Sequence, residues 1–259
     1  MSCLEINGAR LYYELEGREE APLLVLSNSL GTTLDMWAPQ MPALLQHFRV
    51  LRHDARGHGR SDVTPGPYTT AQLGADVLAL MDHLGMARAH FCGLSMGGMI
   101  GMWLGTHHAS RLNRLVLCNT AAKTGTPDIW NQRIAKVEAE GMASIVDLVL
   151  ERWFTAGFRQ RAPDQVAVVR QMLRDTVPAG YSANCAAVRD MDQRAGIASI
   201  RVPTLVIAGT HDGSTPAADG RAVADAIPGA QYVELDAAHL SNWEQSEQFT
   251  QALLNFLTA

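Results

Sequence analysis

Short runs of apolar residues along the chain predict several β-strands. Residues 23–26, Leu-Leu-Val-Leu, form a continuous apolar run, which is typical of a strand buried on both faces of a sheet. Residues 10–16 instead alternate apolar and polar side chains, which predicts a half-exposed strand with residues 4–6 as a possible partner. Residues 49–53 and 89–92 are further short segments in which we expect strands.

A helical spacing of apolar residues lies between two of these runs. From residue 70 to residue 84 the apolar side chains recur at intervals of three and four, at Leu73, Val77, Leu80, Met81 and Leu84. This spacing predicts an amphipathic helix that Thr69 or Thr70 can cap. Further along we expect a helix after residue 95, strands at 114–118, 203–208 and 232–235, a helix at 216–227 and one closing helix at 243–257.

Strands that alternate with helices are typical of an α/β protein with a mostly parallel sheet and helices on both faces. Residues 120–199 interrupt this alternation, because their pattern is helical and contains no convincing strand. We therefore expect residues 1–119 and 200–259 to form an α/β core, and residues 120–199 to form an inserted helical cap over the carboxyl edge of the sheet. The cap holds ten basic and nine acidic residues, so the core carries most of the negative charge.

Size, charge and cysteine content restrict the class of protein. With 259 residues the chain can bury a substantial core. Its formal net charge of −5, without a basic run, argues against nucleic acid as the main partner. We see neither a secretory signal nor an apolar run of membrane-spanning length, so we expect no membrane partner. The four scattered cysteines favour free thiols in a reducing compartment, and hence a cytoplasmic protein.

The candidate chemistry begins at Ser95, which stands between Gly93 and Gly97 in a Gly-x-Ser-x-Gly pattern. The pattern follows a predicted strand and precedes a predicted helix, which is the context of a nucleophile elbow. In such a turn the serine takes unusual backbone angles and the strand and helix approach closely, so residues without a Cβ are needed on both sides. The turn presents the hydroxyl to a base, which makes Ser95 the candidate nucleophile.

A serine nucleophile requires a base, and the base requires an acid that orients it. In chains with this elbow the acid and the histidine follow the serine in that order. Asp212 and His239 each come just after one of the last two predicted strands. The rival position for the acid, after the preceding strand, holds Asn119. We therefore predict a catalytic triad of Ser95, Asp212 and His239.

A serine hydrolase also needs hydrogen-bond donors for the oxyanion of its tetrahedral intermediate. The N–H of Met96, at the start of the helix after the elbow, is one candidate, assisted by the helix dipole. We expect the second donor in the turn after residues 23–26, at the N–H of Leu30. The sequence has no P-loop, no His-Glu-x-x-His motif and no dinucleotide fingerprint, so we expect neither a metal nor an organic cofactor.

Together these residues resemble the α/β-hydrolase family over essentially the full chain, which implies the α/β-hydrolase fold with an inserted helical cap. The glycine-rich loop at residues 54–61 is typical of that family and mostly structural there. The chain resembles most closely the 3-oxoadipate enol-lactonases of bacterial aromatic degradation, in residues 27–32, 93–99 and 119–122, with Trp130, Arg133 and Trp153-Phe154. Where many family members have His-Gly before the oxyanion turn, this chain has Asn28-Ser29.

The resemblance implies hydrolysis of a small enol lactone with a carboxymethyl group to 3-oxoadipate, through an acyl-serine, in the β-ketoadipate pathway. A substrate carboxylate needs a cation or several donors in a dry site. We expect Arg133 to bind it and Trp130 and Trp153 to form walls of the pocket, although arginine on a helix often faces solvent and tryptophan is often core. The expected partner is thus a small anionic lactone, and the sequence carries no indication of oligomeric state.

Other functions of the same fold stay open at this point. A general carboxylesterase, a thioesterase or a carbon–carbon bond hydrolase uses the same triad, and a slowly acting ligand receptor can also retain it. Dehalogenases and epoxide hydrolases of this fold are excluded, because they need aspartate where Ser95 stands. Turnover of the enol lactone, compared with that of a simple ester, discriminates among these possibilities.

Overall fold

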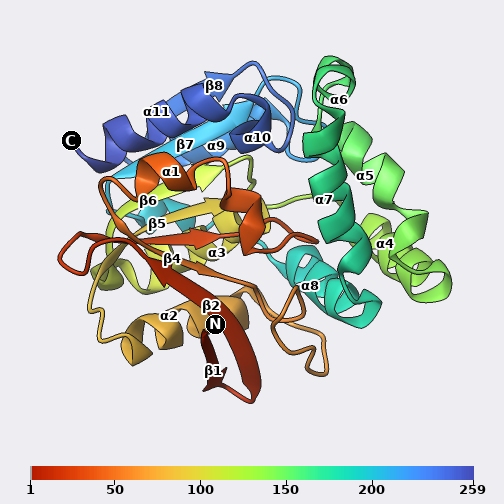
Figure 1. The fold of residues 1–259 in the computed structure, drawn as a ribbon, viewed down its shortest axis with the longest axis horizontal. Helices are drawn as coiled ribbons and strands as arrows, with labels where there is room; N and C mark the ends of the chain where they lie inside the picture. The colour runs from red at the N-terminus through yellow and green to blue at the C-terminus, as the bar shows by residue number, and fades with distance from the viewer. Residues whose placement is uncertain (1) are drawn as a thin grey trace.

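An eight-stranded sheet forms the centre of the molecule (Figure 1). The computed structural model describes residues 2–259. Its strands are β1 (Ser2–Ile6), β2 (Ala9–Glu16), β3 (Leu23–Ser27), β4 (Arg49–His53), β5 (Ala89–Leu94), β6 (Leu112–Cys118), β7 (Thr204–Gly209) and β8 (Gln231–Leu235). They lie in the order β1-β2-β4-β3-β5-β6-β7-β8, antiparallel from β1 to β4 and parallel from β4 to β8. The carboxyl ends of the parallel strands therefore lie along one edge.

Helices pack on the sheet and form a further layer beside it. The first group comprises α1 (Met41–Leu44), α2 (Thr70–His83), α3 (Met96–His107), α9 (Ala217–Ala226), α10 (Ser241–Glu244) and α11 (Ser246–Leu257). The second group gathers on one side of the molecule in Figure 1 and comprises α4 (Pro127–Glu140), α5 (Val146–Trp153), α6 (Ala156–Arg161), α7 (Pro163–Asp175) and α8 (Pro178–Asp190). Among residues 2–259, no helix has both the length and the apolar character needed to cross a membrane.

The sequence determines where these elements start and which faces they bury. Thr69 caps α2, because its side chain accepts a hydrogen bond from the N–H of Gln72 at 3.1 Å. The side chains that predicted an amphipathic helix are buried on one face of α2: Leu73, Val77, Leu80 and Met81. β3 and β5 are buried at every position, as expected for central strands of a parallel sheet. The predicted α/β class and the predicted strands are confirmed.

The prediction of one closing helix at 243–257 is wrong in one respect, because the chain forms two helices there. Gln245 leaves the helical region with φ of −125° and ψ of 51°, which separates α10 from α11. Two side chains of α10, Asn242 and Trp243, donate hydrogen bonds to the carbonyl oxygen of Met36 at 2.9 and 2.7 Å. These buried contacts fix α10 independently of the amphipathic pattern from which the single helix was predicted.

The segment between β6 and β7 holds the second group of helices. All of its residues are described, and residues 120–199 contain helices but no strand. The two ends of the segment are tied together, because the side chain of Lys123 donates to the carbonyl oxygens of Arg189 and Met191 at 3.2 and 3.1 Å. The N–H of Gln193 also donates to the carbonyl oxygen of Ala122 at 2.9 Å. The division into a cap at 120–199 and a core at 1–119 and 200–259 remains our interpretation of this arrangement.

Candidate active site

Ser95 lies in a sharp turn between β5 and α3. Its φ of 57° is one that residues with a side chain rarely adopt. A Cβ added to Gly93 would lie 2.1 Å from the carbonyl oxygen of Gly97, and a Cβ added to Gly97 would lie 2.1 Å from that of Ser27. The chain therefore approaches itself too closely for any residue but glycine at these two positions, as the sequence predicts.

Neighbouring groups hold the backbone of Ser95 in this conformation. Its N–H donates to the carbonyl oxygen of Cys118, the last residue of β6, at 2.9 Å. Its carbonyl oxygen accepts the hydroxyl of Thr120 at 2.8 Å. Strained backbone persists only where the surroundings determine it strongly, and here β6 and its extension supply that constraint.

Asp212 follows β7 and His239 follows β8, so the sheet brings these two side chains together. Oδ2 of Asp212 lies 2.8 Å from Nδ1 of His239, and both side chains are buried. Burial by itself raises the pKa of Asp212, but His239 and hydrogen bonds from Thr215 and Asn119 lower that pKa below its ordinary value. Asp212 can therefore act as a carboxylate that occupies Nδ1 and leaves Nε2 of His239 for a reacting group.

Asn119 links Asp212 to the loop that carries His239. Its side-chain amide donates to Oδ2 of Asp212 at 3.1 Å and to the carbonyl oxygen of Ala238 at 3.2 Å. The side-chain oxygen Oδ1 of Asn119 accepts a hydrogen bond from the hydroxyl of Ser241 at 2.6 Å. This bond identifies the other end of the amide as the NH₂ group that donates to Asp212 and Ala238. The backbone of Asn119 has a φ of 43°, a conformation that asparagine tolerates better than most residues. Asn119 is thus a positioning residue for Asp212 and His239.

We expect Asn119→Gly to lower kcat about tenfold without changing KM, because Asp212 loses a hydrogen bond worth about 1.5 kcal/mol or more. Glycine keeps the positive φ, so the backbone needs no rearrangement. Steady-state kinetics measures the effect. Asn7→Gly is a matched control, since Asn7 is exposed and also has a positive φ, 50°. A kcat for Asn119→Gly within about a factor of two of the wild type contradicts the positioning role.

Ser95 and His239 line one cavity of about 50 Å³, which we call the Ser95 cavity. Within residues 2–259 no hydrogen bond joins the Ser95 hydroxyl to His239, and such bonds often tighten only when substrate binds. Trp153, the last residue of α5, stacks on the imidazole of His239 with ring centroids 5.9 Å apart and planes 30° apart. The helical segment between β6 and β7 therefore contributes directly to the surroundings of the histidine.

Leu30 and Met96, the predicted oxyanion donors, also line the Ser95 cavity. The carbonyl oxygen of Ser29 accepts both the N–H of Thr32 at 3.2 Å and its hydroxyl at 2.8 Å. Because the C=O and N–H of a trans peptide point in opposite directions, these bonds orient the N–H of Leu30 away from Thr32. In the described part of the chain, the N–H groups of Leu30 and Met96 have no hydrogen-bond acceptor. Their oxyanion role remains a prediction.

His58 holds the next peptide of the same turn. Its Nε2 accepts the N–H of Gly31 at 2.7 Å, and its Nδ1 lies 3.4 Å from the carbonyl oxygen of Arg56. Burial lowers the pKa of His58 to about 4, so the ring is neutral near pH 7 and Nε2 can accept. The glycine-rich loop at 54–61 therefore supports the turn that carries Leu30.

The Ser95 cavity brings together seven of the eight predicted site residues: Leu30, Ser95, Met96, Trp130, Arg133, Trp153 and His239. Asp212 lies behind His239, to which it is bonded. Arg133 comes from α4, and its guanidinium lies 5.2 Å from the centroid of the Trp130 ring. Tyr181 of α8 also lines the cavity, and burial raises the pKa of its hydroxyl, so this group is neutral beside Arg133.

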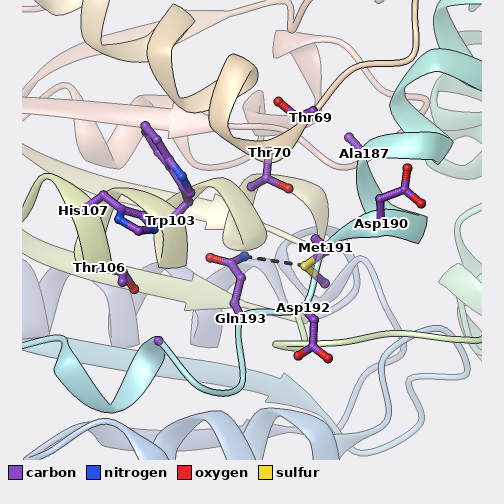
Figure 2. A pocket seen from close by; sticks show the side chains of 11 residues that line it. Thr69, Thr70, Trp103, Thr106, His107, Ala187, Asp190, Met191, Asp192 and Gln193 are labelled. Carbon is purple, nitrogen blue, oxygen red and sulfur yellow. Dashed lines mark hydrogen bonds between the residues drawn. The ribbon is translucent and has the colours of Figure 1, made fainter.

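A larger cavity of about 300 Å³ opens between α2, α3 and the end of α8 (Figure 2). Thr70, Trp103 and Gln193 line it, and the side-chain amide of Gln193 lies 3.5 Å from the sulfur of Met191. Its described lining includes none of the eight predicted site residues. The larger cavity is therefore separate from the predicted site.

Several residues that support the site escaped the sequence analysis. Asn119 had no predicted role in the site, because its amide network depends on a contact between loops that are far apart in sequence. Thr32 follows the predicted oxyanion turn, and a threonine three residues after a serine is a weak signal for the turn it closes. An Asx turn of Asp212 before Thr215 was the structural alternative for this aspartate, and the N–H and hydroxyl of Thr215 do donate to Asp212 at 2.9 Å, beside the contact of Asp212 with His239.

Comparison with known proteins gives a match over most of the chain. A family model described as the alpha/beta hydrolase fold matches residues 22–246. The chain is 43% identical over 251 residues to 3-oxoadipate enol-lactonase 1 of Acinetobacter baylyi, covering 97% of this chain and 94% of that protein. It is 40% identical over 250 residues to 3-oxoadipate enol-lactonase 2 of the same organism, covering 96% and 94%.

A solved structure is similar over the whole length. The enol-lactonase from Burkholderia xenovorans LB400 matches with a TM-score of 0.98 and 51% sequence identity, covering 100% of both chains. The similarity therefore includes the helical segment at 120–199 as well as the sheet.

Proposed function

The chain belongs to the alpha/beta hydrolase family, and we propose that this hydrolase converts 3-oxoadipate enol-lactone to 3-oxoadipate in the bacterial degradation of aromatic compounds. The observation that carries the proposal is the Ser95 cavity, where a candidate nucleophile and base share one small space with an arginine. The relatives named 3-oxoadipate enol-lactonase support this choice of substrate. An anionic lactone supplies both an ester bond for Ser95 and a carboxylate for Arg133.

In the first step, Oγ of Ser95 attacks the lactone carbonyl carbon while Nε2 of His239 takes the hydroxyl proton. The carbonyl oxygen becomes an oxyanion, which the N–H groups of Leu30 and Met96 stabilise. Asp212 stabilises the imidazolium that forms, through its contact of 2.8 Å with Nδ1. The pKa of Asp212 is lowered, so its carboxylate is ionised over the neutral pH range in which this step operates.

In the second step, the tetrahedral intermediate collapses and the bond between the carbonyl carbon and the ring oxygen breaks. The ring oxygen leaves as an enol after taking the proton from Nε2 of His239, and the enol then becomes a ketone. Because the leaving oxygen is part of the lactone ring, it remains attached to the acyl group on Ser95. A water molecule, deprotonated by His239, then attacks the acyl-serine, and the carboxylic acid product and free Ser95 are released.

Arg133 and the tryptophans give the site its selectivity for an anion. The guanidinium of Arg133 lies over Trp130 and beside the neutral Tyr181. Of the described residues that line the Ser95 cavity, none is aspartate or glutamate, so the charge of Arg133 is available to a substrate carboxylate. Trp130 and Trp153 provide apolar walls on which a small ring can rest.

The direct test of this function is loss of the enol lactone, followed by its ultraviolet absorbance, in parallel with hydrolysis of a neutral p-nitrophenyl ester. We expect much faster turnover of the lactone than of the ester. Ser95→Ala should abolish both activities, to about 10⁻⁴ of the wild-type rate or less. Rapid ester hydrolysis without lactone turnover identifies a general esterase instead, and binding of lactone without turnover identifies a receptor.

A second test concerns the carboxylate. We expect Arg133→Ala to raise KM for the enol lactone at least tenfold, because a charge-assisted hydrogen bond contributes about 1.5–3 kcal/mol. The same variant should change KM for the neutral p-nitrophenyl ester by less than about threefold. Similar effects on the two substrates contradict the assignment of Arg133 to the carboxylate.

A further inference from the structure

A second cavity adjoins the Ser95 cavity. It has a volume of about 200 Å³, and we call it the Arg152 cavity after one of the residues that line it but do not line the Ser95 cavity. The two cavities share four lining residues, namely Thr124, Trp130, Arg133 and Ser214. The Arg152 cavity also has the exposed Ile129 on its wall, so it lies between solvent and the buried Ser95.

The charge of the Arg152 cavity is positive. Its described lining includes Arg133 and Arg152 and no aspartate or glutamate. Within residues 2–259 neither arginine forms an ion pair, although the neighbouring Glu151 contacts Arg159 at 3.9 Å. This concentration of positive charge occurs in a chain with a formal net charge of −5. An anion therefore meets a favourable local potential here.

The position of Arg152 links this charge to the site. Arg152 and Trp153 are consecutive residues of the last turn of α5, and Trp153 lines the Ser95 cavity and stacks on His239. The stem of Arg152 lies beside Gly213, whose added Cβ would be 3.6 Å from Cγ of the arginine. Gly213 follows Asp212, so Arg152 lies next to the loop of Asp212 and also lines the Arg152 cavity.

We propose that the Arg152 cavity is a vestibule that binds carboxylate-bearing substrates before they enter the Ser95 cavity, with Arg152 as the first cation they meet and Arg133 as the second. This inference rests on the proposed function for the identity of the substrate, and its chemistry requires only a small organic carboxylate. Arg152 is exposed and screened, so it accelerates capture rather than the chemical step. Its removal lowers kcat/KM for anions and leaves kcat unchanged.

A different role for Arg152 makes a different prediction. A cation in the last turn of a helix can simply stabilise the helix dipole. In that case Arg152→Gln lowers thermal stability slightly and affects charged and neutral substrates alike. The two roles are therefore separated by substrate charge and by salt.

The experiment compares Arg152→Gln with Arg174→Gln, which removes the same charge from an exposed arginine in the last turn of α7, outside both cavities. The substrates are mono-p-nitrophenyl glutarate, which carries a carboxylate, and neutral p-nitrophenyl pentanoate. For Arg152→Gln we expect kcat/KM to fall about three- to tenfold with the anionic ester and to stay unchanged with the neutral ester. The difference should disappear near 1 M salt, where the Debye length is about 3 Å. Arg174→Gln should match the wild type.

The two arginine variants can also be compared by equilibrium binding of a carboxylate, without turnover. Calorimetric titration of Ser95→Ala with glutarate should give weaker binding when Arg152→Gln is added, and unchanged binding when Arg174→Gln is added.

Equal losses in the two arginine variants, or equal losses with the anionic and neutral esters, overturn the vestibule. If the enol lactone is not hydrolysed but the anionic ester shows the expected dependence on Arg152, the lactonase assignment fails and the vestibule stands. If the lactone is hydrolysed and Arg152→Gln behaves as Arg174→Gln does, the vestibule fails and the lactonase assignment stands.

Discussion

The close approach of β3, β5 and α3 around Ser95 is the constraint on which the rest of the site depends. Added Cβ atoms on Gly93 and Gly97 would each lie 2.1 Å from a backbone oxygen. This contact forces the turn that gives Ser95 its φ of 57° and presents its side chain at the carboxyl edge of the sheet. The same turn starts α3 at Met96, so one local geometry sets both the candidate nucleophile and one candidate oxyanion donor.

Around this turn, hydrogen bonds from neighbouring residues hold the peptide groups of the predicted oxyanion turn in place. Thr32 orients the peptide of Leu30, and the neutral His58 holds the peptide that follows it. Asn119 donates hydrogen bonds to Asp212 and to the carbonyl oxygen of Ala238, next to His239. The helical segment at 120–199 then adds Trp130, Arg133 and Trp153 to the lining of the Ser95 cavity. In our proposal the reaction type therefore depends on the ends of the strands, while substrate selection depends on the inserted helices.

Much of this arrangement could be predicted from the sequence, because local patterns determine it. Apolar runs located the strands, and the order Ser95, Asp212, His239 placed three residues at strand ends that a parallel sheet must bring to one edge. The sequence did not predict the break at Gln245 or the amide network of Asn119, because both arise from contacts between residues far apart along the chain. Arg152 escaped notice for the same reason, since only the cavity distinguishes it from other arginines on helices.

We predict above all that Ser95 forms a covalent acyl-enzyme with an anionic lactone. The measurement is the mass of the protein quenched within milliseconds of mixing with excess enol lactone, followed by peptide mapping. Because the leaving oxygen of a lactone stays attached, we predict an adduct equal to the whole mass of the substrate on the peptide that contains Ser95. Turnover at an undiminished rate by Ser95→Ala, or an adduct on a different residue, would contradict the account.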